Sequence, residues 1–170
     1  MSGGEPLVRR VRPSEYDEVS RLRLAAYAHD YELGEEYAAD IADVARHDRE
    51  GEVWVAEDPD GGIVATVTTA APGRTLYELG REGELDWRLL AVAPEARGRG
   101  LGRLLTEFVV MLAVERGLGR VVMNSGSTML AAHALYESMG FARLPERENP
   151  PGVEPERTYG LDLRPPTSEG

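Results

Sequence analysis

The sequence predicts an α/β (α+β) fold, and three consecutive segments in the middle of the chain support this prediction. Residues 85–91 are apolar enough for a mostly buried strand. Residues 101–112 carry apolar side chains at helical spacing, at positions 101, 104, 105, 108, 109 and 112. The turn between them, at residues 97–102, is rich in glycine and arginine. Such a turn before a helix offers backbone N–H groups and the positive end of the helix dipole, so it indicates a site for an anion such as a nucleotide diphosphate.

The other elements follow from apolar periodicity and from the residues that end each element. Pro13 ends the first strand, and Ser14 with Asp17 resembles the capped start of a helix. The run Asp-Pro-Asp-Gly-Gly at 58–62 predicts a hairpin turn, and Gly140 stops the last helix. The expected elements in chain order are a strand at 7–11, helices at 14–29 and 35–49, strands at 52–57, 63–69 and 84–93, a helix at 100–116, a strand at 120–124, a helix at 128–139, and strands at 141–145 and 157–163.

Composition indicates a cytoplasmic protein with a single domain over residues 1–170. The 170 residues, 42% hydrophobic and 29% charged, suffice for one core over about residues 7–164, with frayed ends. No run approaches about 18 apolar residues, and the first residues lack the profile of a signal peptide, so no membrane segment is expected. The absence of cysteine excludes disulfides and thiol catalysis, and three scattered histidines predict no metal site.

The charge pattern bears on the partners of the protein. A formal net charge of −11 argues against nucleic acid, because phosphate binding needs a basic surface. The acidic balance favours a cationic ligand only weakly, because acidic surfaces also keep proteins soluble. All 19 basic residues are arginine, so the chain contains no lysine.

The turn at 97–102 does not match two common nucleotide motifs. The dinucleotide fingerprint needs glycine at i, i+2 and i+5, and its two registers here end at Arg103 and Leu105. A phosphate-binding P-loop needs a lysine. The turn instead fits the pattern Arg-x-x-Gly-x-Gly, formed by Arg97, Gly100 and Gly102. This pattern resembles the diphosphate loop of the GNAT N-acetyltransferases.

Two further segments extend the resemblance to the GNAT superfamily. The run Leu-Leu-Ala-Val-Ala-Pro at 89–94 precedes the loop, and Ala-Leu-Tyr-Glu-Ser-Met-Gly-Phe at 134–141 is similar to the family's Leu-Tyr-x-x-x-Gly-Phe segment. The resemblance implies the GNAT fold, a mixed and mostly antiparallel sheet flanked by about four helices. In that fold the sheet is splayed between the strands that are here at 84–93 and 120–124, and acetyl-CoA lies in the gap. No metal is implied.

The resemblance also assigns residues to acetyl-CoA. The pantetheine arm pairs with the strand before the loop, where a kink directs a backbone N–H at the thioester carbonyl as an oxyanion donor. The family often has asparagine at the position of Met129, and Asn124, Ser127 or Thr128 are candidates for the missing polar contact. The residues implied to contact the cofactor are Leu90, Ala91 and Val92 of the strand, and Arg97, Gly98, Arg99, Gly100, Leu101, Gly102 and Arg103 of the loop.

Acetyl transfer requires a proton donor for the leaving thiolate and a base for the acceptor amine. Tyr136 holds the family's tyrosine position, and a phenol with a pKa of about 10 can donate to a thiolate whose own thiol has a pKa of about 8.5. Glu84 and Asp86 share one face of their strand, roughly 6.6 Å apart along it, and either is a candidate base. The alternative is that neither is catalytic and that one of them pairs with Arg88. His133 is expected at the surface rather than at the cofactor.

The predicted function is transfer of the acetyl group of acetyl-CoA to a primary amine of a small molecule or peptide. Two alternatives stay open: a non-catalytic acyl-CoA sensor with the same fold, and an unrelated phosphate-binding module. The acceptor site is expected at residues 27–37 and 146–156, whose tyrosines and acidic residues fit either a cation site or ordinary packing. Homodimers formed through the terminal strands are common in the superfamily, but this sequence carries no signal for one.

Overall fold

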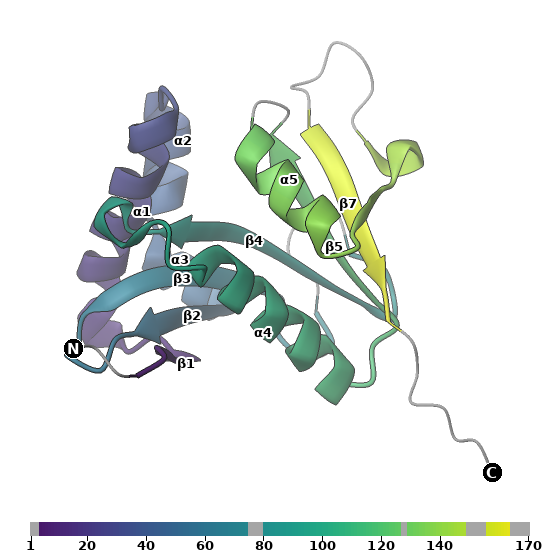
Figure 1. The fold of residues 1–170 in the computed structure, drawn as a ribbon, viewed down its shortest axis with the longest axis horizontal. Coiled ribbons are helices and arrows are strands. Elements are labelled where there is room, and N and C mark those ends of the chain that lie inside the picture. Colours follow the sequence, from purple (N-terminus) through teal and green to yellow (C-terminus); the bar gives the residue numbers. More distant parts are fainter. Residues whose placement is uncertain (1–3, 75–79, 127–128, 149–155, 164–170) are drawn as a thin grey trace. The chain divides into compact units, whose positions relative to one another are not determined.

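The fold is a seven-stranded mixed sheet with helices. The computed structural model describes residues 4–74, 80–126, 129–148 and 156–163. The strand order is β1-β2-β3-β4-β5-β7-β6, and five helices occur in the described residues (Figure 1). The chain divides into two compact units, Met1–Arg74 with Arg88–Phe108 and Thr75–Trp87 with Val109–Gly170, so β4 (Glu84–Val92) contributes to both. The predicted α/β fold class is confirmed.

The N-terminal unit is built on an antiparallel arrangement of its first strands. β1 (Leu7–Arg10) pairs with β2 (Glu52–Glu57), and β2 pairs with β3 (Ile63–Thr69). The predicted hairpin at 58–62 joins β2 to β3, where Asp58 N–H donates to the Gly62 carbonyl. All three strands begin at the residue predicted from the sequence.

The two faces of this sheet carry different helices. Val53 lies opposite Thr68, so the two side chains share one face, and Thr68 accepts a hydrogen bond from Arg23 of α1 (Tyr16–Asp30) at 2.8 Å. Trp54 follows Val53 and therefore points to the other face. There its ring lies 4.8 Å from the ring of Phe108, on α4 (Leu101–Glu115). Helix α1 and the first half of α4 thus cover opposite faces.

Two local predictions for the first helices are wrong. The single helix expected over 35–49 is two helices, α2 (Glu35–Ala42) and α3 (Val44–Glu50). The break is at Asp43, whose carboxylate accepts a hydrogen bond from the backbone N–H of Arg46 and so caps α3. At the start of α1 the local contact is made by Glu15 rather than Ser14, since Glu15 accepts from the Arg12 N–H at 2.9 Å.

The C-terminal unit combines one parallel and two antiparallel pairings. Residues Glu84–Asp86 of β4 run parallel to the start of β5 (Arg120–Gly126), and the pairing covers three positions. β7 (Glu156–Asp162) pairs antiparallel with both β5 and β6 (Ala142–Arg143). Helix α5 (Leu130–Ser138) completes this unit. Within the described part of the chain, no helix is long and apolar enough to cross a membrane.

Candidate functional site

Strand β4 has a kink at Leu89. This residue has a φ of 56°, in the left-handed region that residues with a Cβ rarely adopt. A left-handed conformation costs a leucine about 1–2 kcal/mol, and such strain persists only where the surrounding structure enforces it. Leu89 is buried and Leu90 half-buried, so the kink lies within the packed part of the N-terminal unit. The kink expected in this strand is therefore present.

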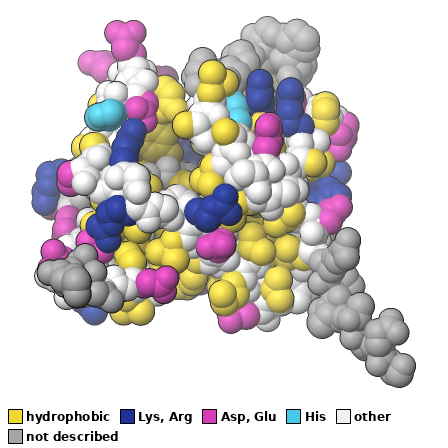
Figure 2. Space-filling view, in the orientation of Figure 1, with side chains coloured by type: hydrophobic (Ala, Val, Ile, Leu, Met, Phe, Trp, Pro, Cys, Tyr) yellow, Lys and Arg dark blue, Asp and Glu magenta, His cyan; other side chains and the backbone are white. Residues whose placement is uncertain are grey.

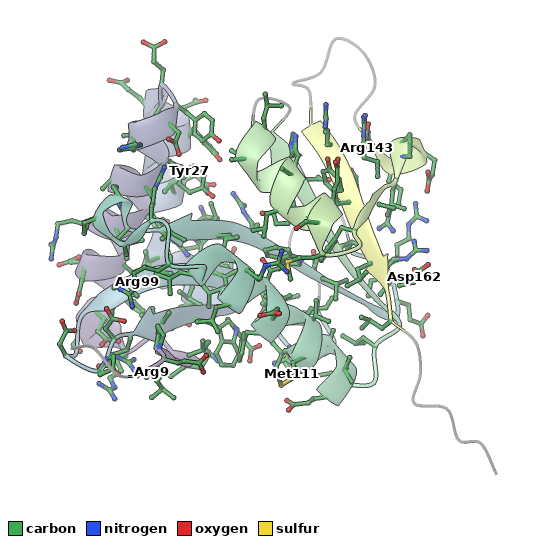
Figure 3. All side chains as sticks on the ribbon, in the orientation of Figure 1. Arg9, Tyr27, Arg99, Met111, Arg143 and Asp162 are labelled. Carbon is green, nitrogen blue, oxygen red and sulfur yellow. The ribbon has the colours of Figure 1, made fainter. Side chains whose placement is uncertain are left out.

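Side chains from two helices hold the residues on either side of the kink. On one side, the Arg88 guanidinium lies 3.1 Å from a carboxylate oxygen of Asp40, on α2. On the other side, the Leu90 carbonyl accepts a hydrogen bond from the Tyr27 hydroxyl at 3.1 Å. Figure 3 labels Tyr27 on α1. The rings of Tyr31 and Tyr37 lie 6.5 and 6.3 Å from the Tyr27 ring.

The loop after β4 has the backbone of an anion cradle. Gly98 and Gly100 have φ values of 83° and 76°, which favour glycine. A Cβ built on either residue would meet nothing within 4 Å, so packing does not account for the two glycines. Helix α4 begins at Leu101, and the N–H groups of a first helical turn have no acceptor within that helix. The loop residues therefore fit the diphosphate that the sequence pattern implies.

The two arginines of this loop contact acidic residues of their own unit. Arg97 donates to Asp30 at 2.8 Å and to the Ala26 carbonyl at 3.0 Å, which ties the loop to the last turn of α1. Arg99, labelled in Figure 3, forms two hydrogen bonds with Asp58 at 2.7 and 2.9 Å. Figure 2 likewise shows arginine side chains lying among acidic ones. Both arginine side chains are therefore paired in this structure, and Arg103 is exposed on the first turn of α4.

A buried arginine lies among the first three helices. Arg23 is fully buried and donates to the Ile41 carbonyl at 3.0 Å, and its guanidinium lies 2.8 Å from Nδ1 of His47. Burial lowers the pKa of Arg23 to about 10. Burial, together with the nearby charge of Arg23, lowers the pKa of His47 to about 4. His47 is therefore neutral near pH 7, and its Nδ1 accepts from Arg23.

In the C-terminal unit, Glu84 is held in an ion pair. Its two carboxylate oxygens accept from Arg147 at 2.8 and 2.9 Å, and Arg120 lies 3.7 Å away. The side chains of Glu84 and Arg147 are only 9% and 3% exposed. Burial alone would raise the pKa of Glu84, but the hydrogen bonds from Arg147 and from the Arg81 N–H outweigh it and keep the pKa below its ordinary value. This geometry favours a structural role for Glu84 over that of a base.

Asp86 and Asn124 lie on the two neighbouring strands of this unit. Asp86 is 1% exposed and pairs in register with Val122. The Asn124 side-chain carbonyl accepts from the Thr158 hydroxyl at 2.6 Å, so its NH₂ group is the part available to donate to a ligand. The alternative polar contacts, Ser127 and Thr128, lie outside the described residues.

Tyr136 is packed in an aromatic cluster. Its ring lies 5.5 Å from the ring of Trp87, 5.8 Å from Phe141 and 5.9 Å from Tyr159. Only 3% of Tyr136 is exposed. His133 is also buried, with its ring 5.5 Å from that of Tyr159, so its expected surface position is wrong. The cluster fixes the ring of Tyr136, as both a proton donor and a core residue require.

Comparison with known proteins decides the family. The profile described as an acetyltransferase (GNAT) domain matches residues 49–143, more than half of the chain. The chain belongs to the GNAT acetyltransferase family. Its match covers the kinked strand, the glycine loop and the segment around Tyr136.

Two curated acetyltransferases are identical to the chain at about a third of the aligned residues. It is 33% identical over 107 residues to N-acetyltransferase family 8 member 2 of Rattus norvegicus, a match over 62% of this chain and 46% of that protein. It is 36% identical over 148 residues to the mycothiol acetyltransferase of Salinispora tropica, a match over 80% of this chain and 44% of that protein. The chain therefore spans less than half the length of these curated relatives.

Solved structures support the GNAT fold. The chain is similar to an acetyltransferase of the GNAT family from Staphylococcus aureus, with a TM-score of 0.73 and 16% identity over 94% of this chain and 99% of that one. It is also similar to the ribosomal-protein-S18-alanine N-acetyltransferase of Escherichia coli, with a TM-score of 0.68 and 16% identity over 97% and 98% of the two chains. At this identity the likeness concerns the fold alone, and it confirms the predicted GNAT fold.

The sequence did not predict the partners of two charged residues of β4, Glu84 and Arg88. Arg147 lies in a charged, proline-rich segment without periodicity, and Asp40 lies in a helix whose break was not predicted. Pairing between residues 48 or 63 positions apart has no local signature in one sequence. The Arg88 contact was considered only with Glu84 or Asp86, whereas the structure pairs Arg88 with Asp40.

Proposed function

We propose that the protein is an acetyl-CoA-dependent N-acetyltransferase that acetylates a primary amine of a small molecule or peptide by direct attack in a ternary complex. One observation carries this proposal: a single segment of the N-terminal unit joins a strained kink at Leu89 to an open glycine loop at the start of α4. A thioester substrate with a diphosphate needs both features on one segment. The first is an aligned backbone donor for the carbonyl, and the second is an anion cradle.

Acetyl-CoA would be held mainly by backbone groups. The N–H groups around Gly98, Gly100 and Gly102 are the proposed diphosphate donors, with Arg97 fixing the loop through Asp30. Leu90, Ala91 and Val92 are the proposed partners of the pantetheine amides, and Asn124 is a further polar contact. In the reaction the amine nitrogen bonds to the acetyl carbon, the carbon–sulfur bond breaks, and a kink N–H stabilises the oxyanion. Tyr136 is the proposed proton donor to the thiolate.

The proton of the acceptor amine needs a separate assignment. Glu84 is one of the two candidate bases from the sequence, but its ion pair with Arg147 occupies both oxygens and stabilises the charged form. We therefore assign Glu84 to anchoring the turn at Pro145–Arg147 and keep Asp86 as the candidate base. A neutral amine that enters already deprotonated is the alternative to a base.

The class of acceptor is proposed only as an amine. The names of these similar proteins mention different acceptors, mycothiol for one and an alanine of a ribosomal protein for another. No metal is required by the proposed chemistry. Action in the cytoplasm and the absence of membrane and nucleic-acid partners stay predictions from the sequence.

A thiol-release assay tests the proposal. The purified chain is incubated with acetyl-CoA and a panel of primary amines and peptides, and free CoA thiol and acetylated product are measured together. The expected result is CoA release that depends on one class of amine, in equal amounts with acetylated product. Tight acetyl-CoA binding without release, across the panel, would favour the alternative of a non-catalytic acyl-CoA sensor.

A further inference from the structure

We infer that Tyr27 and Asp40 are positioning residues that hold the backbone of β4 in its kinked conformation at Leu89. This inference deepens the proposed function, because the kink is the proposed source of the oxyanion donor. The two residues lie on different helices, α1 and α2, and act on opposite sides of the kink. Neither is expected to touch the acetyl group.

The kink requires restraint from outside the strand. Leu89 has a Cβ, so its φ of 56° is unfavourable and no glycine relieves it. Both of its neighbours in sequence, Arg88 and Leu90, form hydrogen bonds with side chains of helices α1 and α2. Restraining both neighbours limits the directions in which the chain enters and leaves residue 89. The two contacts therefore favour the strained conformation that the structure shows.

The contact on the C-terminal side is a hydrogen bond to the main chain. The Tyr27 hydroxyl donates to the carbonyl of Leu90 at 3.1 Å. A carbonyl held in this way fixes the orientation of the Leu90–Ala91 peptide unit, which begins one residue after the kink. The Tyr27 ring is itself supported, since Tyr31, the residue after α1, packs against it and Tyr37 packs against it edge-on from α2.

The contact on the N-terminal side is an ion pair within a larger network. Asp40 lies 3.1 Å from Arg88, accepts a short hydrogen bond from Arg46, and lies 3.5 Å from Nε2 of His47. Burial would raise the pKa of Asp40, but the contacts with Arg46 and Arg88 outweigh it and keep the pKa below its ordinary value. Asp40 is therefore charged near neutral pH and able to hold Arg88.

Arg23 connects this network to the sheet. Its guanidinium donates to the Ile41 carbonyl, one residue after Asp40, and to the Thr68 hydroxyl of β3. The end of α2 is thereby fixed to the same sheet that β4 joins through the hydrogen bond from Ala93 N–H to the Val64 carbonyl. Asp40 thus reaches Arg88 from a rigid position, which a positioning role requires.

Two conservative variants with matched controls test the inference. Tyr27→Phe removes the hydroxyl but keeps the ring, and Asp40→Asn removes the charge but keeps the shape. Tyr16→Phe is the first control, because Tyr16 also lies on α1 and its hydroxyl donates a hydrogen bond at 2.6 Å to Asp48 rather than to β4. Asp43→Asn is the second control, because Asp43 also pairs with Arg46 but does not contact Arg88 in the described structure.

The kinetic readout separates positioning from general stability. Tyr27→Phe and Asp40→Asn are each expected to lower kcat about 3- to 10-fold, the loss expected when one hydrogen bond no longer opposes the strain. The dissociation constant of acetyl-CoA is expected to stay within about twofold of wild type, and the melting temperature to match that of the paired control. The controls are expected to keep the wild-type kcat. An unchanged kcat in both test variants would overturn the inference.

A second readout does not depend on activity. The backbone chemical shifts of Leu89 report whether its φ is positive, so NMR on labelled protein follows the kink directly. Both test variants are expected to shift Leu89 toward an ordinary strand conformation for part of the population, and the controls are not. If the wild type acetylates no amine, the proposed function fails while this measurement still decides the inference. Test variants that keep the full wild-type shifts at Leu89 would refute it.

Discussion

Acidification is expected to destabilise the N-terminal unit through His47. The imidazole has a pKa lowered from 6.5 to about 4 by burial and by the neighbouring Arg23. Below pH 6.5 the unfolded chain takes up a proton at this residue and the folded chain does not, so stability falls with pH. The loss is about 2 kcal/mol between pH 7 and pH 5, and it levels off at about 3 kcal/mol below pH 4. For a chain of this size, 2 kcal/mol corresponds to a fall in melting temperature of about 4–8 °C.

The assay compares thermal unfolding at pH 7 and pH 5 in wild type and in His47→Asn. The asparagine keeps an acceptor near the position of Nδ1 but does not titrate. Its absolute stability is expected to be lower, and its loss between the two pH values is expected to be smaller than the wild-type loss by about 2 kcal/mol. His29→Asn is the control, because His29 is a surface residue, with 57% of its side chain exposed. Equal pH dependence in wild type and His47→Asn would refute the buried neutral histidine.

Three further results are expected. Gly100→Val should weaken acetyl-CoA binding at least tenfold, about 1.4 kcal/mol. The reason is that a Cβ enters the open side of the loop at a residue whose φ is positive. An unchanged affinity in calorimetry would contradict the proposed diphosphate site. Tyr136→Phe should lower kcat by about 10²-fold or more with acetyl-CoA affinity nearly unchanged, and a kcat within twofold of wild type would assign Tyr136 to packing. Glu84→Gln should lower stability by about 1–3 kcal/mol, because the ion pair with Arg147 is lost, and should keep the wild-type pH–rate profile. Asp86→Asn should instead slow the reaction near neutral pH. Recovery of Glu84→Gln above pH 9 would instead make Glu84 the base.

Local patterns in the sequence predicted the elements well. Strands at 52–57 and 63–69 were predicted to the residue, because alternation and an Asp-Gly turn are local signals. Gly100 and Gly102 were recognised by their spacing; of the two, Gly100 has a positive φ, as does Gly98. The break at Asp43 was missed because an aspartate within a periodic segment does not by itself distinguish a cap from an exposed helical position.

Long-range contacts were not predictable from the same patterns. Glu84 and Asp86 differ by two positions and look equivalent on a strand, yet one is paired with Arg147 and the other is buried beside β5. His133 was expected at the surface because an isolated histidine is ordinarily exposed, whereas tertiary packing against Tyr159 places it inside. The partner of a charged side chain depends on how distant segments meet, and one sequence does not state that.

The contact of Arg97 with the end of α1 has a thermodynamic consequence. Asp30 and the Ala26 carbonyl share this guanidinium, so a bound anion that draws the Arg97 side chain away from Asp30 also weakens the contact between the loop and α1. Coupling between two bound ligands is reciprocal: the factor by which such an anion changes the affinity for a ligand at α1 is also the factor by which that ligand changes the affinity for the anion. The order in which two substrates arrive would then change the path but not the final occupancy, and measuring one affinity in the presence of the other gives the size of the coupling.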